Sequence, residues 1–225
     1  MRRIFMFMLT LLVCLPLFAQ AAAKQEAPKP KEITPDQLWT ILLAGNKTFV
    51  AGLVSYTSIK QDREQVAGGQ SPPVTIVSCS DSRVPPELVF NQSLGTLFVI
   101  RSAGNVVDDF GIASIEYAIA KGYTKLIVVL GHKGCDAVVA SLGGADGGTP
   151  ALNELAQRIR SSFLNIPYDS RDPANVQKAV ELNARAAAAS LLARSKLIRD
   201  AAATEAIKIV TANYDTSTGE VKRID

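Results

Sequence analysis

A β-branched run in the first half of the chain ends in three reactive side chains. Residues 74–77 are Val-Thr-Ile-Val, and Cys79, Asp81 and Arg83 follow at alternate positions. Residues two apart on an extended chain point to the same side, so a thiol, a carboxylate and a guanidinium would converge at the end of this strand. That combination is suited to metal binding and proton transfer, and it predicts a chemical site.

A second apolar run ends in a similar way. Residues 126–130 are apolar throughout, and Gly-His-Lys-Gly-Cys follows at 131–135. His132 is the chain's only histidine, and it stands three positions before Cys135. Two thiolates, from Cys79 and Cys135, and one imidazole form a ligand set that zinc accepts. Water or substrate would take the fourth position, unless Asp81 closed it.

The cysteines also allow a second interpretation. Cys14 lies in the leader segment described below, so the mature chain would keep only Cys79 and Cys135. In an oxidising compartment, two cysteines are typical of a disulfide, and the spacing does not separate this from a zinc site. The neighbours favour zinc. Asp81, held by Arg83, would serve as an acceptor beside a metal-bound water, whereas a disulfide has no use for this pair.

Strands and helices alternate along the sequence, which predicts one α/β domain with a mainly parallel sheet flanked by helices. The expected strands are residues 74–78, 97–100, 126–130 and 207–212, with an antiparallel edge strand at 220–224. The expected helices are 35–51, which forms an N-terminal helical arm, a short helical turn started by Pro85 and Pro86, then 110–120, 135–141, 150–163 and 173–194. In such sheets ligands bind outside the carboxyl ends of the strands. If the first and third strands are neighbours, Cys79, His132 and Cys135 meet in one crevice.

The N-terminal segment differs from the rest of the chain. Arg2 and Arg3 precede an apolar run at 4–18, and Ala-Gln-Ala at 19–21 is typical of a signal peptidase site. The run is shorter than the roughly 20 apolar residues of a transmembrane helix. We therefore expect a signal peptide at 1–21, cleaved near Ala21, and a periplasmic or secreted protein with no stable membrane anchor. Residues 22–33 predict a flexible tether, and 34–225 a single domain.

Composition narrows the classes of partner. The chain is 48% hydrophobic and 20% charged, which is ordinary for a globular protein. Its formal net charge of +3 includes the two leader arginines. The remaining Lys and Arg residues are scattered rather than clustered, so no nucleic-acid partner is expected.

Several motifs in consistent order resemble the β-class carbonic anhydrases over residues 38–224. The most specific are Cys-Ser-Asp-Ser-Arg-Val at 79–84 and Gly-His-x-x-Cys at 131–135. Three further segments also resemble family signatures: Gly-Asn-Lys-x-Phe at 45–49, Arg-x-Ala-Gly-Asn at 101–105 and Tyr-Asp-x-x-Thr-Gly-x-Val at 214–221.

The resemblance implies a function and a ligand set. It makes Cys79, His132 and Cys135 the ligands of one Zn²⁺ per chain, with Asp81 and Arg83 as a catalytic dyad beside the metal. The implied reaction is the reversible hydration of carbon dioxide to bicarbonate and a proton. In it, a zinc-bound hydroxide oriented by the dyad attacks CO2, in keeping with the ability of zinc to lower the pKa of bound water.

The resemblance also implies substrate-binding residues and an assembly. Gln70 corresponds to a substrate-binding glutamine that is contributed across a dimer interface, so a homodimer or dimer-based oligomer is expected. Phe98 and Tyr117 correspond to aromatic residues that wall the pocket, and their patterns predict burial in the core. Gly104 corresponds to a glycine whose backbone amide faces substrate.

One departure from the family bears on regulation. In family members that bicarbonate switches off at a separate pocket, a Trp stands three residues before the first zinc cysteine. Here that residue is Ile76, although Arg101 stands where the pocket's arginine would be. We therefore expect an open site near neutral pH. Asp81 would be a fourth ligand only in a closed state at lower pH.

Two rival functions remain open at this level. One is a zinc enzyme of the same fold that acts on another small cumulated substrate, such as carbonyl sulfide or carbon disulfide. The other is a non-catalytic periplasmic binding protein with a Cys79–Cys135 disulfide. Metal analysis and a CO2 hydration assay separate the three.

Overall fold

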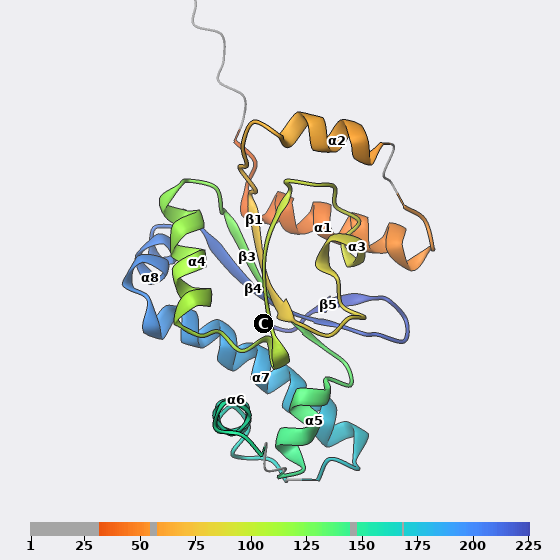
Figure 1. Ribbon diagram of the computed structural model, residues 1–225, viewed down its shortest axis with the longest axis vertical. Helices are drawn as coiled ribbons and strands as arrows, with labels where there is room; N and C mark the ends of the chain where they lie inside the picture. Colours follow the sequence, from red (N-terminus) through yellow and green to blue (C-terminus); the bar gives the residue numbers. More distant parts are fainter. Residues whose placement is uncertain (1–31, 55–57, 145–147, 168) are drawn as a thin grey trace, which may run out of the picture. The chain divides into compact units, whose positions relative to one another are not determined.

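The protein folds around a five-stranded sheet with strand order β2-β1-β3-β4-β5 (Figure 1). The computed structural model describes residues 32–54, 58–144, 148–167 and 169–225. Four strands are parallel and the last is antiparallel to its neighbour, which confirms the predicted α/β fold. The strands are β1 (Val74–Cys79), β2 (Leu97–Ser102), β3 (Leu126–His132), β4 (Lys208–Tyr214) and β5 (Val221–Arg223).

The helices lie where the sequence pattern predicts them, with two additions. They are α1 (Pro35–Val50), α2 (Ile59–Val66), α3 (Pro86–Val89), α4 (Asp109–Ala120), α5 (Asp136–Leu142), α6 (Pro150–Arg160), α7 (Pro173–Arg194) and α8 (Lys196–Ala203), with a 3-10 turn η1 (Ala103–Asn105). The sequence pattern did not predict α2 or α8. Helix α2 buries none of its residues and so has no apolar stripe, and α8 begins directly after Ser195, which caps it.

Alternate strand residues supply two apolar layers, one on each face of the sheet. Ile76 and Val128 pack with α1 residues such as Leu42. Val77 and Val129 point to the opposite face and pack with residues from α4, α7 and α8. Both layers are continuous because the side chains of a strand alternate between its faces. The central strands are therefore buried, and their carboxyl ends are held in fixed positions.

Helix α1 is anchored to the far edge of the sheet by one buried amide. Asn46 Nδ2 donates to the carbonyl oxygens of Val89 (3.0 Å) and Gly219 (2.8 Å), and Asn46 Oδ1 accepts from Val221 N–H (2.9 Å). The preceding Gly45 approaches closely, since a Cβ built there would lie 1.9 Å from the Phe90 carbonyl oxygen. These contacts explain why a glycine at position 45 is followed directly by an asparagine at position 46.

Residues 33–225 form one compact unit. The predicted signal peptide and nearly all of the tether lie outside the described residues and stay predictions. Among the described helices, none is long and apolar enough to cross a membrane.

Candidate metal centre

Three of the predicted ligands meet at the carboxyl ends of two adjacent strands. Cys79 is the last residue of β1 and His132 the last of β3, and these strands pair in register. Cys135 is the N-cap residue of α5. All three are buried, and one candidate ligand atom from each lies within 4.8 Å of the others. The first and third strands are neighbours, so the condition under which the three residues would meet is fulfilled.

The two cysteines are free thiols in this structure. Their Sγ atoms lie 3.8 Å apart, well beyond the roughly 2.05 Å of a disulfide bond. The contact with Cys135 lowers the pKa of Cys79, burial opposes this shift, and His132 and the amides of Asp81 and Gly104 add to the lowering. The same contact and burial raise the pKa of Cys135. Cys79 is therefore the more acidic thiol, and thiolate is the form that binds metals.

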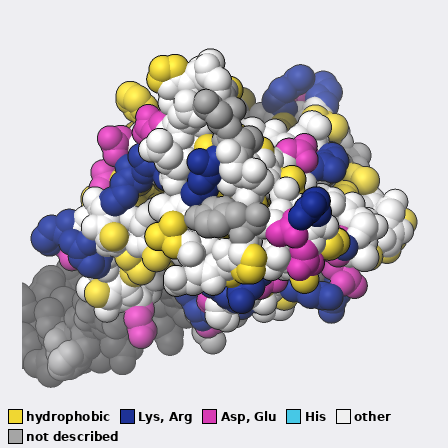
Figure 2. Space-filling model, turned by 90° about the horizontal axis from the view of Figure 1, so that it is seen from below, with side chains coloured by type: hydrophobic (Ala, Val, Ile, Leu, Met, Phe, Trp, Pro, Cys, Tyr) yellow, Lys and Arg dark blue, Asp and Glu magenta, His cyan; other side chains and the backbone are white. Residues whose placement is uncertain are grey.

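His132 is oriented so that its Nε2 could bind a metal. Its Nδ1 lies 3.2 Å from the Lys133 carbonyl oxygen, which favours the tautomer with the proton on Nδ1. Its Nε2 is buried and has no hydrogen-bond partner. No histidine is visible on the face drawn in Figure 2, in keeping with the full burial of His132. An orphaned imidazole nitrogen beside two thiols fits a metal that prefers nitrogen and sulfur ligands, such as zinc.

Backbone amides surround the Cys79 sulfur. The N–H of Asp81 lies 3.4 Å from Sγ, and that of Gly104 lies 3.3 Å from it. The Gly104 amide is thus directed at the sulfur, and its contact with substrate stays a prediction. Such donors stabilise a thiolate, because they place partial positive charge next to it.

Asp81 and Arg83 form a two-point ion pair at the rim of the centre. Arg83 Nε donates to Asp81 Oδ1 (2.9 Å) and Arg83 Nη2 to Oδ2 (2.6 Å). The Arg83 guanidinium holds the pKa of Asp81 well below its usual range. Asp81 Oδ2 also lies 3.8 Å from His132 Nε2. A carboxylate is therefore held beside the candidate metal position, as the sequence predicted.

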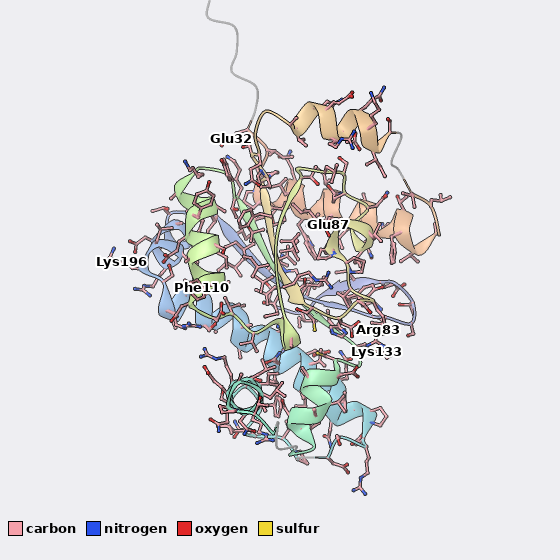
Figure 3. The ribbon with its side chains drawn as sticks, viewed as in Figure 1. Glu32, Arg83, Glu87, Phe110, Lys133 and Lys196 are labelled. Atoms are coloured by element: carbon pink, nitrogen blue, oxygen red, sulfur yellow. The ribbon has the colours of Figure 1, made fainter. Side chains whose placement is uncertain are left out.

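The loop that carries Asp81 is fastened at two further points. Arg101 donates from Nε to the carbonyl oxygen of Cys79 (3.0 Å) and from Nη2 to that of Asp81 (2.6 Å). Arg83 Nη2 reaches the Gly134 carbonyl oxygen at 3.5 Å, and Figure 3 shows Arg83 beside Lys133. Sequence comparison linked Arg101 only to a regulatory pocket. Here Arg101 fixes the backbone from Cys79 to Asp81, and no local sequence motif predicts this role.

The other predicted substrate residues lie away from this centre in the same chain. Gln70 is exposed and precedes β1, and Phe98 pairs with Thr75, four residues before Cys79. At roughly 3.3 Å per strand residue, that separation is about 13 Å. Tyr117 lies in the last turn of α4 and packs edge-on against Tyr123. All three therefore lie towards the amino-terminal ends of the strands.

The predicted burial of Phe98 and Tyr117 is wrong. The side chain of Tyr117 is 48% exposed, and Phe98 is only partly buried. Phe98 lies on β2, which is an edge strand and has a neighbour on one side among the described residues. Apolar type and spacing indicate a face of an element, but they do not show whether another element covers that face.

Gly104 provides a test of how tightly the centre is packed. It has φ +62°, and a Cβ built there would lie 2.7 Å from Ile159 Cδ1. We expect Gly104→Ala to lower the free energy of unfolding by roughly 2–3 kcal/mol, from backbone strain plus crowding. Gly122 has a similar φ of +70°, but a Cβ built there would have no neighbouring atom within 4 Å. Gly122→Ala should therefore cost only backbone strain of about 1 kcal/mol. Urea denaturation measures both, and equal losses would contradict the packing argument.

Comparisons with known proteins agree with this geometry. The family described as carbonic anhydrase matches residues 74–221. "Carbonic anhydrase 2" of Mycobacterium tuberculosis is 37% identical over 189 residues, covering 82% of this chain and 90% of its own length.

Two solved structures have the same fold. The Coccomyxa β-carbonic anhydrase in complex with acetazolamide has a TM-score of 0.64 and 29% identity, covering 73% of this chain and 77% of its own. A tetrameric β-carbonic anhydrase of Sordaria macrospora has a TM-score of 0.66 and 26% identity, covering 83% and 96%. The family match spans more than half of the chain and includes all three candidate ligands. The chain therefore belongs to the β-class carbonic anhydrase family.

Proposed function

We propose that this carbonic anhydrase is zinc-dependent and hydrates CO2 reversibly to bicarbonate and a proton, with Asp81 and Arg83 as its catalytic dyad. The observation that carries the proposal is the gathering of two free thiols and an unpartnered imidazole nitrogen within 4.8 Å. Cys79, His132 and Cys135 would hold one zinc ion per chain. When bound, zinc acts as a Lewis acid that turns water into a nucleophile near neutral pH.

Asp81 would orient the nucleophilic water. Its Oδ2 is held 3.8 Å from His132 Nε2, so an acceptor lies beside the nitrogen that would bind the metal. The two hydrogen bonds from Arg83 keep Asp81 ionised. Because a carboxylate can only accept, the water would have to donate a hydrogen to Asp81, and this would leave a lone pair of its oxygen for the carbon of CO2. Because Arg83 already occupies both carboxylate oxygens, this arrangement supports the open form. Closure by Asp81 would require that pair to separate.

Zinc content and CO2 hydration, measured on one sample of the mature chain, test this proposal. We expect one zinc per chain and rapid hydration in a stopped-flow assay. A zinc-free protein with a Cys79–Cys135 disulfide would overturn it in favour of a binding protein. Zinc together with turnover of carbonyl sulfide or carbon disulfide, but not of CO2, would overturn the assigned substrate.

We further propose a homodimer, or an oligomer of dimers, in which the partner subunit completes each site. Strand β2 supports this, because it is an edge strand with partly exposed apolar residues, and such edges are rarely left uncovered. The related Sordaria macrospora enzyme is described as tetrameric. The distant positions of Gln70, Phe98 and Tyr117 are explained if they serve the metal centre of the other subunit.

Mixed dimers test the role of Gln70. Alone, Gln70→Ala should be weakly active and Cys79→Ser inactive. After random subunit exchange we expect activity at roughly a quarter of the sites, since half of the dimers are mixed and each then has one complete site. If mixing restores no activity, Gln70 does not act across an interface. The control mixture combines Lys60→Ala with Cys79→Ser. Lys60 is exposed on α2, so the Lys60→Ala protein should have normal activity before mixing.

We also propose export to the periplasm or exterior, which rests on the composition of residues 1–21 alone. N-terminal sequencing of the protein recovered from the periplasm of a bacterial host should begin at Ala22. Recovery in the cytoplasm with Met1 retained would contradict export.

A further inference from the structure

Asn183 is a buried amide without an assigned role. It lies in the middle of α7 and is 4% exposed. Its helical neighbours Ala179, Ala184 and Ala187 are buried and apolar. Burying an amide in such surroundings is unfavourable unless it is hydrogen-bonded. Its bonds therefore indicate what it contributes.

The amide of Asn183 holds one peptide of the turn η1. Asn183 Nδ2 donates to the Gly104 carbonyl oxygen at 2.7 Å, and this bond is buried. Ser162 Oγ lies 3.4 Å from Asn183 Oδ1, but its one proton has a nearer acceptor in the Ile159 carbonyl oxygen at 2.6 Å, so the bond to Gly104 is the main polar contact of the amide. Helix α7 passes below the sheet, near the carboxyl ends of its strands (Figure 1). Asn183 thereby connects the longest helix to the segment that borders the metal centre.

The N–H of that same glycine points to a ligand sulfur. Gly104 N lies 3.3 Å from Cys79 Sγ, and its φ of +62° is a conformation that few side-chain-bearing residues adopt. The geometry points to Asn183 as a positioning residue that holds Gly104 so that its N–H stays on the Cys79 sulfur. This inference rests on the proposed zinc site. It adds a residue that contacts neither metal nor substrate and acts through Gly104.

The expected consequence follows from how a hydrogen bond changes a thiolate. An N–H···S bond draws electron density from the sulfur, so the sulfur donates less to a bound metal. Outer partners of this kind orient ligands, and their loss typically weakens metal binding 10- to 100-fold. Asn183 holds the carbonyl of the 104–105 peptide, and this peptide is joined at the Gly104 Cα to the 103–104 peptide that carries the N–H. Without the Asn183 bond, Gly104 is held less firmly, its N–H can move off the sulfur, and the electronic environment of Cys79 changes.

The test uses the full-length mature protein with Co²⁺ in place of zinc. The thiolate-to-cobalt charge-transfer band reports on the ligand sulfurs directly. Asn183→Leu keeps a similar volume but cannot donate a hydrogen bond, and Asn183→Ala removes the amide. We expect both variants to shift this band and to release zinc to a chelator roughly 10-fold faster, at the lower end of the outer-partner range.

Asn46→Ala is the matched control. Asn46 is also a 4% exposed asparagine that bonds backbone carbonyls, but it anchors α1 at the far edge of the sheet. Its loss should lower stability without moving the cobalt band. A band at the wild-type wavelength in both Asn183 variants, whatever their stability, would overturn the inference. If one variant fails to fold, the other decides.

The wild-type spectrum distinguishes a failure of the Asn183 positioning role from a failure of the proposed zinc site. If the wild-type protein takes up cobalt and shows the band, a failure of the Asn183 variants to shift it rejects only the positioning role. If wild type binds neither cobalt nor zinc, the proposed zinc function fails and the positioning role fails with it.

Discussion

Replacing Cys79 by serine is expected to abolish zinc binding and CO2 hydration together. The contact with Cys135 and the hydrogen bonds from the amides of Asp81 and Gly104 lower the pKa of the Cys79 thiol, which favours the thiolate that binds metal. A serine hydroxyl remains protonated at neutral pH and is a poor ligand for zinc. Loss of one hydrogen-bond partner of a ligand typically lowers metal affinity or activity 10- to 100-fold. Loss of the ligand itself should therefore reduce the rate by more than about 100-fold.

Metal analysis and stopped-flow hydration on the purified variant measure both effects. Ser82→Ala is the control, because Ser82 is exposed in the same loop between the dyad residues. It should keep zinc and rate. A Cys79→Ser protein with one zinc per chain and the wild-type rate would show that Cys79 is not a ligand. Circular dichroism checks that the variant keeps its fold.

Replacing Asp81 by asparagine is expected to leave zinc in place while most of the rate is lost. Asparagine has nearly the same shape, but its amide nitrogen donates, so it cannot provide two acceptor oxygens to both Arg83 and a water molecule. Positioned proton acceptors typically contribute about 10²- to 10⁴-fold to a rate. We expect a loss within that range, with zinc content unchanged.

The chain contains a natural control for this variant. Asp169 and Arg171 form the same pair two residues apart, with Arg171 N and Nε both bonded to Asp169 Oδ1 (3.0 and 3.1 Å). In the dyad, Arg83 N and Nε bond Asp81 Oδ1 in the same way, at 2.9 Å each. Asp169→Asn removes a like ion pair at an exposed site and should leave the rate unchanged. If Asp81→Asn keeps the full rate as well, the dyad has no catalytic role.

Much of the fold was predictable because it depends on local periodicity. The buried runs at 74–78 and 126–130 became β1 and β3, since continuous apolar sequence suits a strand covered on both faces. Thr34 and Pro35 began α1 as predicted, because a side-chain cap and a fixed φ act within one turn. Helix α2 was missed for the same reason, because it carries no buried face.

Part of the site was predictable and part was not. Cys79, Asp81 and Arg83 lie within five residues, and His132 and Cys135 within four, so each cluster could be identified from spacing alone. The burial of Phe98 and Tyr117 was wrongly predicted, because whether an apolar face is covered depends on distant elements. Asn183 and Arg101 were missed as supports of the centre, because each acts on backbone atoms far away in sequence.

The sequence by itself determined the two clusters of candidate side chains and that each cluster follows a strand, because residue type and period are local properties. Only the tertiary structure decided that β1 lies next to β3, and therefore that the two clusters meet. It also separated the two interpretations of the cysteines in this structure, since 3.8 Å between sulfurs leaves them unbonded and near a histidine nitrogen. Strand order and interatomic distance depend on packing over the whole sheet, and no spacing within one segment specifies them.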